Sequence, residues 1–246
     1  MSVDTPDQLR GLKRVGRVVA ATLEALRRAV RPGITTGELD AIAAGVFAAH
    51  GARSGPILTY GYPASICVSV DDEVVHAIPG NRVLSAGQLV TVDVAADLDG
   101  FHADAARTVP VGSVDERRRK LIAATRGALA AGISAAQPGG TLRDIGAAVD
   151  RETRARGFCV IRELTGHGIG LAMHEPPSVP NWAAPSATDL LTPGLVFTIE
   201  PMITAGEPKI VIDADGWTVR TADRSPAAHE EHTVMVAPDG PVVLTA

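Results

Sequence analysis

The sequence predicts an α+β fold made of two similar halves, each with a pair of helices followed by strands. Three observations indicate this fold: a repeated segment, a helix-length stretch before each copy, and short apolar runs after them. The 246 residues are 46% hydrophobic, which is enough for one large domain or two small ones. No linker or low-complexity tract divides the chain. We therefore expect one domain over residues 1–246, with halves at about 6–112 and 113–246.

The repeated segment is a Pro-Gly turn followed by a helix start. Residues 31–39 match residues 137–145 at an offset of 106 without a gap. The matched positions are Pro32, Gly33, Thr35, Glu38 and Leu39 in the first copy and Pro138, Gly139, Thr141, Asp144 and Ile145 in the second. A threonine followed three residues later by glutamate is a capping box, and the aspartate of the second copy makes a weaker one.

The capping boxes predict one helix in each half, and a second helix precedes each turn. The capped helices are expected to end at Gly51 and Gly157, again 106 residues apart, because glycine favours a helix C-terminus. The preceding helices are expected at about 6–30 and 115–136. The matched proline, threonine and glycine positions favour duplication of one unit over the chance occurrence of two Pro-Gly turns, each followed by a capped helix.

Five polar residues lie within or at the ends of short apolar, strand-like runs after the helices. They are Asp93, Asp104, His167, Glu200 and Glu231. Burying an unpaired charge is very costly, and these runs contain no cation that would neutralise four carboxylates. The missing cations are therefore expected to be metal ions, held at the junction of the two halves.

The first two candidates lie on a predicted hairpin whose loop contains Asp99-Gly100, a strong hairpin signal. A two-residue loop places Asp104 opposite Ala95, with Asp93 one diagonal step away. A four-residue loop instead pairs Asp93 directly with Asp104. Either loop places both carboxylates on one face, about 5–8 Å apart at Cβ. Arg107 has the opposite parity and is expected to point away. The alternative reading is a pair of solvated hairpin carboxylates.

The candidate ligands predict two divalent ions. Four carboxylates and one imidazole exceed the roughly four ligands of a closed zinc site. They suit two ions about 3.5–4 Å apart, bridged by carboxylates and a water. Oxygen-rich ligation with one imidazole favours Mn²⁺, Fe²⁺ or Co²⁺, with Zn²⁺ as a further candidate. Such ions activate water and polarise a carbonyl, so hydrolysis is the expected reaction.

Composition excludes several classes of protein. The net charge of −5 and the pI near 5.8 leave no basic surface of the kind that binds nucleic acid. The first 17 residues are mostly polar or charged, and no apolar span long enough for a membrane helix follows them. Only Cys67 and Cys159 are present, so no disulfide framework is implied, and a reduced cytoplasmic location is expected.

The order and spacing of the candidate ligands resemble the pita-bread metallopeptidases, and within them the type I methionine aminopeptidases. The resemblance covers about Gly11 to Val243. It is carried by His76-Ala-Ile-Pro79, Val92-Asp-Val94, Asp99-Gly-Phe-His-Ala-Asp104, Gly166-His-Gly-Ile-Gly170, Met173-His-Glu-Pro176, Ile199-Glu-Pro-Met202, Asp215-Gly-Trp217 and Glu231-His-Thr233. It implies a duplicated pita-bread fold, with a curved antiparallel sheet covered by two pairs of helices. It also implies a dinuclear metallo-aminopeptidase.

The same resemblance implies a role for each candidate ligand. Asp93 would bind one ion, and Asp104 and Glu231 would bridge the two. His167 and Glu200 would complete the second site. Glu200 would also accept the proton of the attacking water. The two ions would be Co²⁺, Mn²⁺, Fe²⁺ or Zn²⁺.

Two further histidines and an apolar pocket are implied for the substrate. His76 and His174 would line the cleft and hydrogen-bond the peptide backbone. His174 would also stabilise the charge of the tetrahedral intermediate. The pocket for the methionine side chain would contain Tyr62, Cys67, Met173 and Trp217. Without its motif, His76 would be interpreted as a structural residue at a strand end.

The chain departs from the family pattern at the presumed pocket. Thr59 and Tyr60 stand where Tyr-His is expected, and Met173 stands where phenylalanine is frequent. These changes are expected to affect specificity and rate but not the metal site. His102 shares the face of Asp104, where it either supports the ligands or fills space. His229 receives no assignment.

The implied function is removal of the initiator methionine from nascent proteins when the second residue is small. Its partner would be the N-terminal methionine of a nascent chain, near the ribosome, and a monomer is expected. One alternative is a related peptidase with another preference, such as Xaa-Pro cleavage, against which the His76-Ala-Ile-Pro79 motif and the short chain argue. Another is a non-catalytic binding module, which would be expected to lose metal ligands, whereas all five are present.

Overall fold

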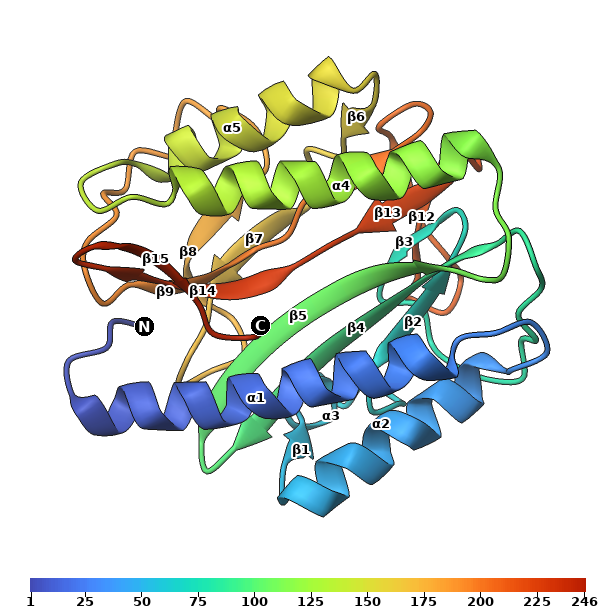
Figure 1. Cartoon of the computed structure of the whole chain (residues 1–246), viewed down its shortest axis with the longest axis horizontal. Coiled ribbons are helices and arrows are strands. Elements are labelled where there is room, and N and C mark those ends of the chain that lie inside the picture. Colours follow the sequence, from blue (N-terminus) through green and yellow to red (C-terminus); the bar gives the residue numbers. More distant parts are fainter.

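The computed structural model describes all 246 residues (Figure 1). The helices are α1 (Pro6–Ala29), α2 (Thr36–His50), α3 (Gly55–Tyr60), α4 (Glu116–Ala135) and α5 (Leu142–Ala155). The strands before α4 are β1 (Arg53–Ser54), β2 (Cys67–Val70), β3 (Glu73–Val75), β4 (Leu89–Leu98) and β5 (Phe101–Pro110). The strands after α5 are β6 (Cys159–Val160), β7 (Thr165–Gly168), β8 (Glu175–Pro180), β9 (Val196–Ile199), β10 (Met202–Thr204), β11 (Ile210–Ile212), β12 (Val219–Thr221), β13 (Ala227–His229), β14 (His232–Ala237) and β15 (Gly240–Val243).

The four long helices lie where the sequence predicts them, because the same local signals start both capped helices. At the start of α2, Thr35 Oγ1 accepts the N–H of Glu38 at 3.1 Å, and the Glu38 carboxylate accepts the N–H of Thr35 at 2.7 Å. At the start of α5, the Asp144 carboxylate accepts the N–H of Thr141 at 2.8 Å. The two capping boxes of the repeat are therefore real structural elements.

The glycines predicted to end the capped helices adopt left-handed backbone conformations. Gly51 directly follows α2 with a φ of 67°, which costs glycine little. In the second half, Arg156 lies between the end of α5 and Gly157, whose φ is 80°. Both helices are thus followed by a glycine in the left-handed conformation, although α5 stops one residue earlier than the repeat predicts.

Each helix pair packs over a hydrophobic core of its own. One cluster of 23 buried residues lies between α1, α2 and the neighbouring strands, and a second cluster of 23 lies beneath α4 and α5. Buried side chains of α1 recur at helical spacing and include Leu12, Val15, Val19, Leu23 and Leu26. In Figure 1, one helix pair lies above and the other below the central strands β4, β5 and β14. No helix is both long and apolar enough to cross a membrane.

All strand pairs are antiparallel. One sheet contains β1, β2, β4 and β5, and another has the order β15-β14-β9-β7-β8. Two smaller sheets have the orders β13-β10-β6 and β11-β12-β3. The antiparallel α+β arrangement predicted from the sequence is confirmed, and its strands are divided among four hydrogen-bonded sheets.

The β4–β5 hairpin has the two-residue loop. Ala95 pairs with Asp104 and Asp93 pairs with Ala106 along an unbroken register. The turn residues Asp99-Gly100 both have positive φ, 55° and 79°, as the tight hairpin turn with this sequence requires. Asp93 and Asp104 therefore share one face, one diagonal step apart, as the two-residue alternative predicts.

Threonine hydroxyls join the two halves where β5 runs beside β13 and β14. Thr233 Oγ1 accepts the N–H of Asp104 at 2.9 Å and donates to the Asp104 carbonyl at 2.7 Å. Thr108 Oγ1 makes the same two bonds to the backbone of His229, each at 2.9 Å. Between them, the N–H of Glu231 donates to a carbonyl of β5 at 2.9 Å. These bonds continue an antiparallel register between the halves and satisfy backbone groups that would otherwise be buried without partners.

Candidate metal centre

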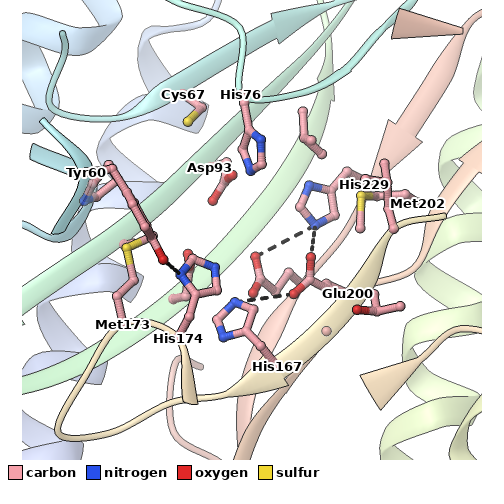
Figure 2. Close-up of a pocket in the computed structure, with 18 of the residues that line it drawn as sticks. Tyr60, Cys67, His76, Asp93, His167, Met173, His174, Glu200, Met202 and His229 are labelled. Carbon is pink, nitrogen blue, oxygen red and sulfur yellow. Dashed lines mark hydrogen bonds and ion pairs between the residues drawn. The ribbon is translucent and has the colours of Figure 1, made fainter. Parts of the chain in front are cut away.

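A cavity of about 480 Å³ lies between strands of the two halves and contains all eleven side chains predicted for the site. They are Asp93, Asp104, His167, Glu200 and Glu231, then His76 and His174, and finally Tyr62, Cys67, Met173 and Trp217. Figure 2 shows side chains from both halves facing one another across this space. The structure therefore brings together every residue that was expected as a metal ligand, a cleft histidine or a pocket residue.

The first half supplies Asp93 and Asp104 from the inner face of the β4–β5 hairpin. Alternation along β4 turns Val92 to the opposite face, into the core under α1 and α2, so that the carboxylates face the cavity. Asp104 is only 4% exposed, which excludes a pair of solvated hairpin carboxylates. Cys67 pairs with Asp93 in the β2–β4 ladder, and this register brings the thiol to the same wall.

His167 reaches the cavity because two glycines let β7 pack tightly between β8 and β9. A Cβ atom on Gly166 would lie 2.5 Å from the carbonyl oxygen of Thr198, and one on Gly168 would lie 2.2 Å from that of Pro176. Both distances are shorter than real contacts allow. The His167 N–H donates to Thr198 Oγ1 at 3.0 Å. The Gly-His-Gly motif is thus a packing requirement that holds an imidazole at the cavity.

Glu200 directly follows β9, and Glu231 directly precedes β14. Both are almost fully buried, at 8% and 2% exposed respectively. Thr198 Oγ1 donates to Glu200 Oε1 at 2.7 Å, and this oxygen lies 3.5 Å from His167 Nε2. Glu231 Oε1 and Asp104 Oδ1 have no hydrogen-bond partner. Buried carboxylate oxygens without partners are strongly unfavourable as anions, so this arrangement favours either added protons or a bound cation.

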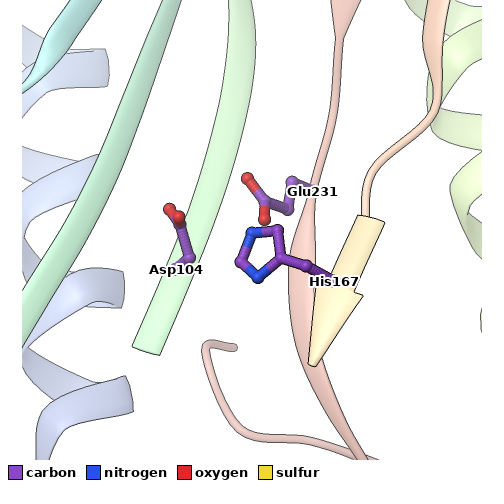
Figure 3. Close-up of side chains that lie close together, drawn as sticks. All are labelled: Asp104, His167 and Glu231. Atoms are coloured by element: carbon purple, nitrogen blue, oxygen red, sulfur yellow. The ribbon is translucent and has the colours of Figure 1, made fainter. Parts of the chain in front are cut away.

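Three of the predicted ligands form a compact cluster. The ligand atoms of Asp104, His167 and Glu231 all lie within 4.8 Å of one another (Figure 3). Asp93 and Glu200 line the same cavity outside this cluster. Because Asp104 comes from the first half and the other two from the second, the cluster forms only when the halves are joined. Its mixed oxygen and nitrogen atoms suit a divalent transition metal.

The electrostatics of the carboxyl groups also fit a cation. Burial raises the pKa of Asp93 to about 6, and burial together with the charge of Asp93 raises the pKa of Glu200 to about 8. Burial and then the neighbouring carboxylates raise the pKa values of Asp104 and Glu231 well above their usual range. Without a cation, the four groups must share protons, because their charges repel. Divalent ions would replace those protons.

Desolvation by the surrounding protein lowers the pKa values of the cavity imidazoles, which favours their neutral form. The pKa of His167 is lowered to about 3, and those of His76 and His174 are lowered as well. The rings of His167 and His174 lie 4.0 Å apart between centroids. His76 has a φ of 60°, which non-glycine residues rarely adopt, so the turn after β3 holds it in a strained conformation. A neutral imidazole can ligate a metal or donate one N–H to a substrate.

The rest of the cavity wall is apolar and contains sulfur. Tyr62 and Trp217 form an edge-to-face pair with centroids 5.1 Å apart, and the Tyr62 hydroxyl donates to a backbone carbonyl at 2.8 Å. Burial raises the pKa of the Cys67 thiol, which keeps it neutral. Met173 is buried, and its sulfur lies 3.3 Å from the position of a Cβ on Gly55. Such a wall suits a flexible apolar side chain.

Two contacts of the cavity were missed by sequence reasoning. His229 is 2% exposed, with Nε2 at 3.7 Å from Glu231 and 4.0 Å from Glu200 (Figure 2). The spacing of two residues between His229 and Glu231 is a signal that could have placed them on one face. The second contact joins the hydroxyl of Tyr60 to His174 at 2.6 Å. These residues are 114 positions apart, and no local pattern connects them.

The remaining polar candidates lie outside the cavity. His102 does not line the cavity, and its Nε2 is 3.6 Å from Asp97. Arg107 points away from the carboxylates into a separate surface pocket, as its parity predicts. His232 bonds to Thr245 Oγ1 at 2.9 Å. None of these basic side chains neutralises the buried carboxylates.

Comparison with known proteins places the chain in a family. Residues 10–238 match metallopeptidase family M24. The chain is 46% identical to methionine aminopeptidase 1 of Mycobacterium tuberculosis over 97% of this chain and 92% of that protein. It is 43% identical to a methionine aminopeptidase of Clostridium perfringens over 95% of this chain and 94% of that protein.

Solved structures share the architecture. A crystal structure of methionine aminopeptidase from Thermotoga maritima matches with a TM-score of 0.96 and 36% identity, covering 100% of this chain and 99% of that one. Prolidase from Pyrococcus furiosus matches with a TM-score of 0.80 and 20% identity, covering 99% of this chain and 65% of that one, which shows the fold alone. The duplicated pita-bread fold predicted from the sequence is confirmed. The chain therefore belongs to metallopeptidase family M24 and is a metal-dependent hydrolase.

Proposed function

We propose that the protein is a methionine aminopeptidase, which hydrolyses the peptide bond after an N-terminal methionine when the second residue is small. The observation that carries this proposal is the cavity itself, where buried carboxylates and an imidazole meet an apolar, sulfur-containing wall. Relatives named methionine aminopeptidases that align with nearly the whole chain support the choice of substrate.

The donor set supports two metal ions. Asp93 would hold one ion, His167 and Glu200 the other, and Asp104 and Glu231 would bridge them. Two divalent charges would balance four carboxylates, and the oxygen-rich set favours Mn²⁺, Fe²⁺ or Co²⁺, with Zn²⁺ also suited. When bound, divalent ions polarise the scissile carbonyl and lower the pKa of the attacking water.

The residues of the chain then orient the peptide and move the proton. Thr198 holds one oxygen of Glu200, which leaves the other oxygen to accept the proton of the attacking water. His174 is neutral and would donate an N–H to the carbonyl oxygen as its negative charge develops, a contribution often worth about 3 kcal/mol. His76 lies across the cavity from His174 and would bind the peptide backbone (Figure 2).

The apolar wall would select the first side chain. Tyr62 and Trp217 would pack along the methionine side chain, while Cys67 and Met173 add polarisable sulfur. The free N-terminal amine would lie beside the metals, which makes the reaction an exopeptidase reaction. The proposal includes a single catalytic domain over residues 1–246, a monomer, and action in the cytoplasm on chains emerging from ribosomes.

The deciding experiment is release of free methionine from Met-Ala-Ser by chelator-stripped protein titrated with Mn²⁺, Fe²⁺ and Co²⁺. Metal-dependent release, with an Ala-Pro peptide left intact, is the expected result. Cleavage of the Ala-Pro peptide alone would indicate an Xaa-Pro peptidase instead. Two bound ions without hydrolysis of either peptide would indicate a binding module, and absence of bound metal would overturn the proposal.

A further inference from the structure

The hydroxyl of Tyr60 connects α3 of the first half to His174 of the second. Tyr60 is the last residue of α3 and is 49% exposed, at the rim of the cavity. Its hydroxyl oxygen lies 2.6 Å from His174 Nδ1, and the two rings are tilted by 55° with centroids 5.4 Å apart (Figure 2). It is the one hydrogen bond that the His174 side chain makes.

The direction of this hydrogen bond follows from the chemistry of its partners. Desolvation raises the pKa of Tyr60, so the phenol keeps its proton at neutral pH. A phenol O–H is a good donor, whereas its oxygen is a weak acceptor compared with an imidazole nitrogen. His174 Nδ1 therefore accepts. Since a neutral imidazole carries one N–H, the proton of His174 lies on Nε2, the nitrogen turned away from Tyr60.

The neighbouring His167 is held in the opposite tautomer. Its Nδ1 lies 2.9 Å from the carbonyl oxygen of Gly168, and a carbonyl can only accept. His167 therefore carries its proton on Nδ1 and presents an unprotonated Nε2 toward Glu200, as a metal ligand must. Two imidazoles only 4.0 Å apart thus present different groups to the cavity, a lone pair from one and an N–H from the other.

We propose that Tyr60 is a positioning residue that holds His174 in the tautomer with the proton on Nε2, so that this N–H can bond the substrate carbonyl. This inference rests on the proposed function, because it assigns the hydrogen-bond donor for that reaction. The backbone of the His174 loop is held separately, by Glu175, whose carboxylate accepts the N–H groups of Leu171 and Ala172 at 2.7 and 2.8 Å. That contact holds the backbone and not the imidazole ring, whose one hydrogen bond is to Tyr60.

The tautomer can be measured without any turnover. In zinc-loaded protein labelled with ¹⁵N-histidine, the His174 signals are assigned by their loss in His174→Ala. We expect an unprotonated Nδ1 and a protonated Nε2 for His174, and a mixture of tautomers in Tyr60→Phe. Tyr62→Phe is the matched control, because it removes a phenol hydroxyl from the same cavity that bonds to backbone carbonyls and not to His174. A proton on His174 Nδ1, or an unchanged tautomer in Tyr60→Phe, would overturn the proposal.

A double-mutant cycle tests whether Tyr60 acts through His174. Tyr60→Phe should lower kcat for Met-Ala-Ser about 10-fold, the size expected when an orienting hydrogen bond is lost, with little change in KM. In the His174→Ala background, the same substitution should have no further effect. An equal loss in both backgrounds would show that Tyr60 acts independently. If wild-type protein released no methionine, the proposed function would fail, while the tautomer measurement would still decide this inference.

Discussion

The two halves of the molecule contribute to one cavity by different structural means. The first half supplies Asp93 and Asp104 from strands of ten residues each, paired in an unbroken register. The second half supplies its ligands at or beside the ends of short strands, and the register of β7 against β8 shifts between His167 and Gly168. A long ladder sets the direction of a side chain by alternation alone. Short strands rely on packing around glycine and threonine.

The helices of the two halves, in contrast, remain alike. Both capped helices begin at a threonine with an acidic partner, and the two main cores contain 23 buried residues each. Capping and burial are local or pairwise requirements that any copy of the unit must meet. The strands of the two halves differ where they carry the metal ligands. The similarity between the halves is therefore clear in the helices and their cores and weakest in the strands that line the cavity.

Asp104 is the carboxylate of the first half that clusters with His167 and Glu231 of the second half. Its substitution should have the largest effect on activity. Asp104→Asn should lower kcat at least about 10³-fold, because metal ions supply several kcal/mol of transition-state stabilisation. Metal content measured by atomic emission should fall with it. Asp99→Asn is the matched control: Asp99 lies in the exposed turn of the same hairpin and pairs with Arg14, so activity and metal content should persist. Full activity of Asp104→Asn would exclude a bridging role.

His174 tests the contribution of the second half to the transition state. His174→Ala should lower kcat by about 10²–10³-fold while the metal content stays unchanged, because the imidazole donates to developing charge without ligating metal. Steady-state kinetics on Met-Ala-Ser would measure this. A higher KM at constant kcat would instead show that His174 only binds substrate.

Removing the metal should weaken the join between the halves in a pH-dependent way. In the metal-free protein, the pKa of Glu200 is about 8, above its usual 4.5, so the folded state holds a proton that the unfolded chain releases. This stabilisation is complete below the usual pKa and is lost as pH rises through about 8. Metal at about 1,000 times its dissociation constant should raise the free energy of unfolding by about 4 kcal/mol. Urea titrations with and without chelator would measure both effects. Stability of the metal-free protein that increases from about pH 7 to about pH 8, where the histidines of the unfolded chain are already mostly neutral, would contradict the assignment.

The threonine bonds between the halves can be tested with an isosteric change. Thr233→Val keeps the shape but leaves two backbone groups of Asp104 without partners, which should cost about 2 kcal/mol of unfolding free energy. Thr192→Val, at an exposed position, should change it by less than about 0.5 kcal/mol. Equal stabilities of the two variants would show that the hydroxyl bonds do not hold the halves together.

The smallest expected effect is a difference in stability between cap substitutions in the two copies of the repeat. Both threonine hydroxyls donate to the carboxylate of the acidic partner, but only Thr35 Oγ1 also accepts the N–H of that partner, Glu38. Thr35→Ala should therefore cost about 1 kcal/mol, and Thr141→Ala about half of that. Chemical denaturation of both variants would measure the difference. A larger loss at Thr141 would show that the second capping box is the stronger one.

The sequence predicted the parts of the site that depend on local rules. Alternation placed Asp93 and Asp104 on one face and Arg107 on the other, and the Asp99-Gly100 turn set the register between them. The sequence left the loop length open, and the structure has the two-residue form. Resemblance to a family nominated the cavity residues, which the structure places together. His229 was missed although its spacing of two residues from Glu231 could have placed it on the same face.

The sequence by itself determined the four long helices, the threonine caps of the repeat and the faces of the residues in β4 and β5, because these follow from hydrogen bonds and periodicity within a few residues. Only the tertiary structure decided how deeply the carboxylates are buried and which groups meet across the cavity. The contact of Tyr60 with His174 spans the two halves, and the hydroxyls of Thr233 and Thr108 join strands that no local signal pairs. Periodicity states which way a side chain points. What it meets there depends on the packing of the whole chain.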